Sequence, residues 1–156
     1  MNSIRIEHYL SLAESACRFS DNTRTRVGCV VVYRNSVISV GWNPENKEHP
    51  IQKKYNKLRG NYTSAPEFVS RVHAEVMALA RIKYMFIDWS CVSVFVCRIL
   101  KDGTREMARP CAACEAYIRS VGIRNVYYTT AGGYLYERLW LYVYKICVFI
   151  LRKRIC

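Results

Sequence analysis

The chain has 156 residues and a formal net charge of +12 at pH 7. Its length suits one domain with a sizeable core, and its hydrophobic content of 51%, with few glycines and prolines, excludes a disordered or fibrous protein. The positive charge favours a phosphate-bearing partner, either a nucleotide or a nucleic-acid strand. Charge alone does not separate this interpretation from a purely solubilising role.

The first half of the chain predicts a helix, a β-hairpin and a long polar connection. Residues 4–19 place apolar side chains at helical intervals, with Ser3 as the candidate N-cap. Two β-rich runs, 27–33 and 37–42, are separated by three residues, which is typical of a hairpin. Residues 43–71 follow as a long basic loop. Loops of this length are often lids or binding loops, so we expect it at the rim of a site.

The second half alternates helices and strands. The expected elements are a helix over 73–86, a strand over 91–100, a helix over 111–121, a strand over 125–130 and a last element over 134–138. Gly122 closes the second of these helices. The turn at 131–133 is short enough for a hairpin, which would make the last strand antiparallel, but the sequence leaves the orientation of this strand open. This order predicts a single α/β domain over residues 1–156 with a mixed sheet.

The apolar tail, 139–156, ends in three basic residues. Its apolar run is too short to span a bilayer, which needs about 20 residues, so no transmembrane segment is predicted. We expect the tail to cover a sheet edge or an interface in a homo-oligomer, with a membrane-surface anchor as the alternative. The charged N-terminal residues contain no secretory signal, so we expect a cytoplasmic protein whose eight cysteines are reduced.

Two short motifs stand at the starts of predicted helices. One is residues 73–75, His-Ala-Glu, and the other is residues 110–114, Pro-Cys-Ala-Ala-Cys. Cys111 and Cys114 share one helical face, and the positive end of a helix favours thiolates. If the two helices lie side by side on the sheet, His73 can approach both sulfurs. One nitrogen and two sulfurs are three zinc ligands, and a three-ligand zinc site is typically catalytic because it keeps a position for water.

Each motif alone has a weaker interpretation. A lone C-x-x-C could be a redox pair, and a lone histidine is more often a side chain without metal. The combination of H-x-E with P-C-x-x-C is far more specific, because it is the signature of zinc-dependent nucleobase deaminases. In that signature the glutamate, here Glu75, carries protons and does not bind the metal.

The chain resembles the cytidine and deoxycytidylate deaminase superfamily, closest to the deoxycytidylate-deaminase-like branch with phage and viral members. Besides the zinc motif, the resemblance is carried by the stretches RVGCVVV, SVGWN and SVGIRNVYYTT, and it runs from about Val27 to Arg138. It implies a three-layer α/β/α fold, in which a five-stranded mixed sheet has helices on both faces.

The resemblance also implies residue roles. Its zinc ligands map onto His73, Cys111 and Cys114, which would hold one catalytic Zn2+ per chain. Its general acid/base maps onto Glu75. Asn43 would bind the nucleoside sugar, although an Asx-turn before Pro44 is the structural alternative. The Ala74 backbone would help to hold the base. Arg26 and Arg109 flank the motifs and are weaker candidates for phosphate contacts.

Three functions follow as hypotheses. The first is hydrolytic deamination of a pyrimidine nucleotide, deoxycytidylate foremost, to the uracil form with release of ammonia. The second is deamination of a base within single-stranded DNA or tRNA, which the net charge and the basic loop favour. The third is a zinc-stabilised binding module without catalysis, against which the presence of Glu75 argues.

Overall fold

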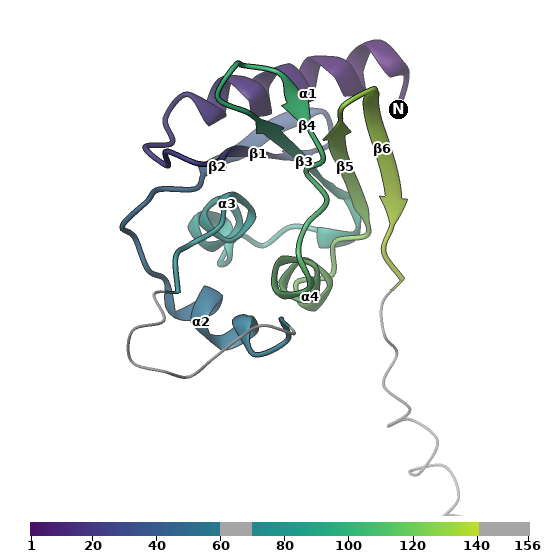
Figure 1. Ribbon diagram of the computed structural model, residues 1–156. Coiled ribbons are helices and arrows are strands. Elements are labelled where there is room, and N and C mark those ends of the chain that lie inside the picture. Colours follow the sequence, from purple (N-terminus) through teal and green to yellow (C-terminus); the bar gives the residue numbers. More distant parts are fainter. Residues whose placement is uncertain (60–69, 141–156) are drawn as a thin grey trace, which may run out of the picture.

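A computed structural model describes residues 1–59 and 70–140. Its centre is a mixed sheet in the order β2-β1-β3-β5-β6 (Figure 1). The strands are β1 (Arg26–Tyr33), β2 (Ser36–Trp42), β3 (Val92–Ile99), β4 (Arg105–Glu106), β5 (Asn125–Thr130) and β6 (Gly133–Arg138). β3 and β5 are parallel, whereas β1 pairs with both β2 and β3 in antiparallel fashion. The two-residue β4 pairs with the end of β3 and adds a sixth strand to the five expected.

Helices cover both faces of the sheet (Figure 1). Helix α1 (Ser3–Cys17) packs on one face, where its Leu10 joins a buried cluster with Phe95 of β3. Helices α3 (Ala74–Ile82) and α4 (Ala112–Ser120) lie on the other face, over a second and larger cluster. The predicted three-layer α/β/α fold is therefore confirmed.

Local sequence explains where these helices begin and end. The N-cap of α1 is Asn2, one residue before the expected Ser3, because the Asn2 carboxamide oxygen accepts a hydrogen bond from the Arg5 N–H. After α4, Gly122 has a φ of 95°. Its N–H and that of Ile123 donate to carbonyls of the last helical turn, which is a Schellman ending that glycine accommodates without strain.

The segment 43–71 is not a loop throughout. It contains helix α2 (Pro50–Asn56), which packs beside α4. Glu48, which precedes this helix, and Arg71, at the end of the segment, form an isolated antiparallel bridge. His49 is the N-cap, and its ring nitrogen Nδ1 accepts a hydrogen bond from the Ile51 N–H. The polar composition of this segment concealed a helix of only seven residues.

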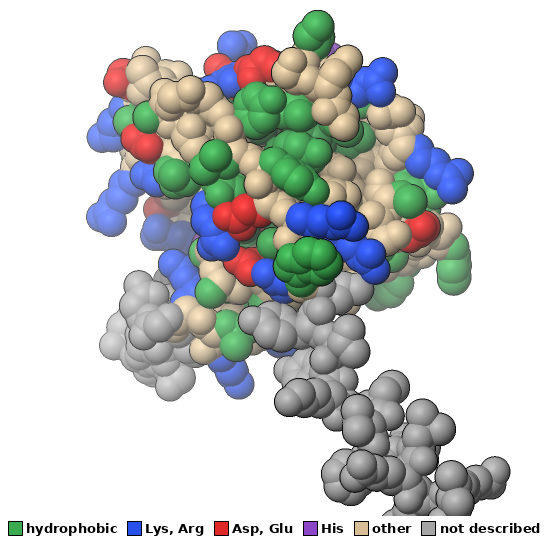
Figure 2. Space-filling model, turned by 90° about the vertical axis from the view of Figure 1, so that its right-hand side faces the viewer, with side chains coloured by type: hydrophobic (Ala, Val, Ile, Leu, Met, Phe, Trp, Pro, Cys, Tyr) green, Lys and Arg blue, Asp and Glu red, His purple; other side chains and the backbone are tan. Residues whose placement is uncertain are grey.

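The last two strands form an antiparallel hairpin, which settles the orientation that the sequence left open. β6 lies at the edge of the sheet, and apolar and charged side chains mingle on this side of the molecule (Figure 2). Leu135 and Tyr136 of β6 and the following Trp140 are exposed. Residues 141–156 of the apolar tail lie outside the described residues. Within the described residues, no helix is long and apolar enough to cross a membrane.

Two glycines let the helices approach the sheet closely. A Cβ at Gly41 of β2 would overlap the Ala74 carbonyl oxygen of α3 and lie 2.6 Å from the Ala78 nitrogen. A Cβ at Gly28 of β1 would similarly overlap the Ala13 carbonyl oxygen of α1. Glycine at these two positions therefore sets the distance between each helix and the sheet.

We expect Gly41→Ala to lower the free energy of unfolding by at least about 1–3 kcal/mol, because it overpacks the α3 contact. It should also weaken zinc binding, since α3 begins beside His73. Gly28→Ala is the matched control, because it overpacks the opposite face, against α1. Chemical denaturation and zinc titration of both variants test this. Equal loss of zinc affinity in the two variants would contradict the assigned role of Gly41.

Candidate active site

The starts of α3 and α4 bring the two sequence motifs together. His73 is the N-cap of α3 and Cys111 is the N-cap of α4, and neither side chain makes the usual capping hydrogen bond to its own helix. The two side chains instead point toward each other and toward Cys114. Cys114 lies in the first turn of α4 and is fully buried.

The three side chains have the spacing of a zinc site. The Nδ1 atom of His73 lies 3.5 Å from the Cys111 sulfur and 3.3 Å from the Cys114 sulfur. All three ligand atoms fall within 4.8 Å of one another. A tetrahedral ion with Zn–S bonds of about 2.3 Å and a Zn–N bond of about 2.0 Å would separate sulfur from nitrogen by about 3.5 Å. The donor set therefore fits zinc in both chemistry and distance.

The environment prepares one thiol for metal binding. Hydrogen bonds from Cys114 and His73, despite burial, lower the pKa of Cys111 to about 3. Burial raises the pKa of Cys114, and the neighbouring Cys111 and Glu75 raise it further. Cys111 is thus the sulfur that loses its proton more readily, and Cys114 would lose its proton as zinc binds.

Glu75 adjoins this cluster from the first turn of α3. It is only 4% exposed, and burial raises the pKa of its carboxyl, an effect partly offset by the charge of His73. The distances that define the ligand cluster join His73, Cys111 and Cys114, and Glu75 is not a member of it. The arrangement is three ligands with a neighbouring buried carboxyl.

Comparison with known proteins agrees with this geometry. A family model described as the cytidine and deoxycytidylate deaminase zinc-binding region matches residues 3–130. The chain belongs to this family. No match was found among curated proteins.

Solved deaminases share the fold. The dCMP deaminase from the cyanophage S-TIM5 is 25% identical in its apo form, with a TM-score of 0.58 over 83% of this chain and 86% of that chain. The same phage enzyme in complex with dCMP and dUMP is also 25% identical, with a TM-score of 0.56 over 82% of each chain. A cytidine deaminase from Burkholderia pseudomallei is 17% identical, with a TM-score of 0.58 over 88% and 93% of the two chains.

A buried chain of polar side chains that begins in α2 supports His73. The Gln52 side-chain oxygen accepts a hydrogen bond of 3.0 Å from the His73 N–H. Its amide nitrogen donates to Asn56, whose own amide nitrogen donates to Ser70. Gln52 is completely buried. Sequence reasoning missed this support, although the i,i+4 spacing of Gln52 and Asn56 was a usable signal.

We expect Gln52→Leu to lower the free energy of unfolding by about 1–3 kcal/mol, because it leaves the His73 N–H and the Asn56 side-chain oxygen without partners. Lys53→Leu is the matched control on the exposed side of α2 and should change stability by less than about 0.5 kcal/mol. Urea denaturation of the two variants measures the difference. Equal stabilities would mean that the buried chain does not hold the site.

Asn43 directly follows β2, and its side chain makes several hydrogen bonds to the preceding loop. Its side-chain oxygen accepts hydrogen bonds from the Val27 N–H and the Ser20 hydroxyl, and its amide nitrogen donates to the Thr25 carbonyl. These bonds fix the loop before β1 against the end of β2. The sugar-binding role of Asn43 stays a prediction beside this structural one.

The other residues expected to contact the substrate, Ala74, Arg109 and Arg26, lie in different surroundings. Ala74 is buried as the first residue of α3, where its N–H lies among the groups without an intrahelical partner. Its role in holding the base stays a prediction. Arg109 is engaged by Glu137 and Glu115, which satisfy its charge within the protein. Arg26 is exposed at the start of β1 and lines a surface hollow with Arg24 and Lys101.

Proposed function

We propose that the protein catalyses hydrolytic deamination of a cytosine nucleotide, deoxycytidylate foremost, to the uracil form with release of ammonia. The observation that carries the proposal is the His73, Cys111 and Cys114 cluster with buried Glu75 beside it. The likeness to a phage dCMP deaminase solved with dCMP and dUMP supports a pyrimidine nucleotide as the substrate.

Glu75 is the proton carrier in this proposal. Its carboxyl takes a proton from the attacking water, delivers it to the ring nitrogen, and assists the departure of ammonia after the carbon–oxygen bond has formed. His73, Cys111 and Cys114 would hold a zinc ion, which would supply the Lewis acidity that makes water nucleophilic near neutral pH. The Ala74 N–H and the Asn43 carboxamide would orient the base and the sugar.

Ammonia release across a panel of substrates tests the proposal. The zinc-loaded protein should turn over dCMP faster than cytidine, deoxycytidine or adenine and guanine nucleotides. Turnover of no member of the panel would contradict the proposal. If such protein still held one zinc per chain and also failed on polynucleotides, the non-catalytic binding module would be supported instead.

Deamination within a polynucleotide is the second candidate. The net charge of +12 and the exposed lysines in and around α2, Lys47, Lys53, Lys54 and Lys57, favour it. Binding to single-stranded DNA or tRNA should then fall steeply with rising salt, because phosphate contacts release counterions. A gel-shift assay at low salt decides between the candidates. Homo-oligomerisation and a cytoplasmic location stay predictions.

A further inference from the structure

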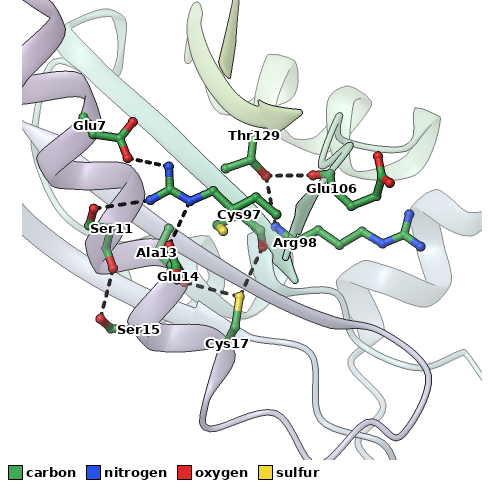
Figure 3. A network of polar contacts seen from close by, with 11 residues as sticks. Glu7, Ser11, Ala13, Glu14, Ser15, Cys17, Cys97, Arg98, Glu106 and Thr129 are labelled. Carbon is green, nitrogen blue, oxygen red and sulfur yellow. Dashed lines mark hydrogen bonds and ion pairs between the residues drawn. The ribbon is translucent and has the colours of Figure 1, made fainter. Parts of the chain in front are cut away.

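Arg98 lies on the same face of the sheet as the candidate active site. Side chains alternate along a strand, and Val94 and Val96 of β3 belong to the cluster beneath α3 and α4. Arg98 continues this row, whereas Cys97 points into the cluster beneath α1. Figure 3 shows the Arg98 side chain extending away from Glu7, Ser11 and Cys17, the residues of α1.

Sheet register places Arg98 in the row next to the Val96–Cys29 pair on the same face of the sheet. Val96 pairs with Cys29 of β1, and Cys29 lies close enough to Glu75 that, after burial, the Glu75 charge raises the pKa of its thiol. Arg98 is two residues beyond Val96, about 7 Å along the strand. Its own partner across the sheet is Val27, whose N–H is held by Asn43. Arg98 is therefore beside the expected sugar-binding end of the site.

Within the part of the chain that the structure describes, the Arg98 guanidinium has no hydrogen-bond or ion-pair partner. Among the buried side-chain nitrogen and oxygen atoms of residues 1–59 and 70–140, only the Nε atom of Arg98 makes no hydrogen bond. Glu106 lies opposite Arg98 in the register, but its carboxylate accepts from the Met107 N–H, and no bond joins it to Arg98 in Figure 3. By contrast, Arg105 and Arg109 each bind two glutamates.

A partly buried cation without a counter-ion is unfavourable unless a ligand supplies one. The residue keeps part of its surface exposed, so a ligand can reach it. A guanidinium presents a planar fork of donors that matches phosphate oxygens better than any neutral group. We propose that Arg98 binds the phosphate of the nucleotide substrate and so selects a nucleotide over a nucleoside. This inference rests on the proposed function.

Calorimetric titration of the zinc-loaded protein with dUMP and with deoxyuridine tests it. The wild type should bind dUMP more tightly than deoxyuridine. Arg98→Gln should weaken dUMP binding by about 10- to 100-fold and leave deoxyuridine binding unchanged. The dUMP affinity of Arg98→Lys should lie between those of the wild type and Arg98→Gln, because lysine keeps the positive charge but lacks the planar fork of donors. Arg34→Gln is the control, since it removes one exposed positive charge in the turn at the other end of β1.

The outcomes separate the two proposals. Equal loss of dUMP affinity in Arg98→Gln and Arg34→Gln would show a general effect of net charge and overturn the role of Arg98. Wild-type protein that binds the two ligands equally, or binds neither, would overturn it as well. Deamination of deoxycytidine and dCMP at equal rates, unaffected by Arg98→Gln, would leave the deaminase in place while removing this inference. A melting temperature matching that of the wild type confirms that Arg98→Gln is folded.

Discussion

Replacement of Glu75 by alanine is expected to leave zinc and the fold in place and to remove nearly all turnover. Glu75 is outside the ligand cluster, so its loss leaves one nitrogen and two sulfurs to bind the metal. Positioned proton transfer contributes about 10²- to 10⁴-fold to a rate, or about 3–5 kcal/mol of barrier. One carboxyl is asked here to move several protons, so the loss should reach the top of that range. Metal analysis, melting temperature and the rate on dCMP measure it.

Glu75→Gln is the matched control for size, because it keeps the volume of the buried side chain but cannot carry the proton. Glu75→Gln should be as inactive as Glu75→Ala, and its melting temperature should be at least as high as that of Glu75→Ala. Loss of zinc together with activity would make Glu75 a ligand and the site structural. Substantial residual activity would place the proton carrier elsewhere.

Cys114→Ala should have the largest effect on the protein itself. Cys114 is buried in the first turn of α4, and His73 approaches it from the start of α3. Its removal should release zinc and loosen both helix starts together, because metal binding is coupled to folding. Apparent binding free energies of structural zinc reach about 10–16 kcal/mol, so zinc should no longer raise the melting temperature of this variant.

Cys97→Ala is the control for the removal of a buried thiol. Cys97 lies in the cluster on the opposite face of the sheet, beneath α1. Its replacement should therefore leave the zinc stoichiometry unchanged. The measurement is the shift in melting temperature on addition of zinc to each variant. A full zinc-induced shift in Cys114→Ala would contradict the assignment of this sulfur as a ligand.

Periodicity predicted most of the fold. The runs around β1, β2, β3 and β5 were bounded to within one or two residues, because buried β-branched and aromatic stretches are strong local signals. Neither α2 nor β4 was foreseen. α2 is too short to show a clear period, and β4 has only two residues, so both depend on tertiary contacts. Helix α3 ends at Ile82, before the expected residue 86, where Tyr84 and Phe86 become exposed.

The zinc ligands could be predicted because their residue types and spacing are specific. The residues that support or extend the site could not. Gln52 acts through a backbone N–H that is 21 positions distant in the sequence, and its i,i+4 spacing to Asn56 indicates only the contact between those two side chains. Arg98 reads as an interruption of an apolar strand. Its importance emerges only when sheet register places it beside Val27 and leaves its guanidinium nitrogen unpaired.

We propose that His73, Cys111, Cys114 and Glu75 together make a zinc-dependent deaminase of a cytosine nucleotide. Titration of zinc into metal-free protein, while the conversion of dCMP to dUMP is followed, tests this most directly. Activity should rise in proportion to bound zinc and stop rising at one zinc per chain, while Glu75→Gln should take up the same zinc without gaining activity. Full zinc uptake by the wild type with no conversion of dCMP would contradict it.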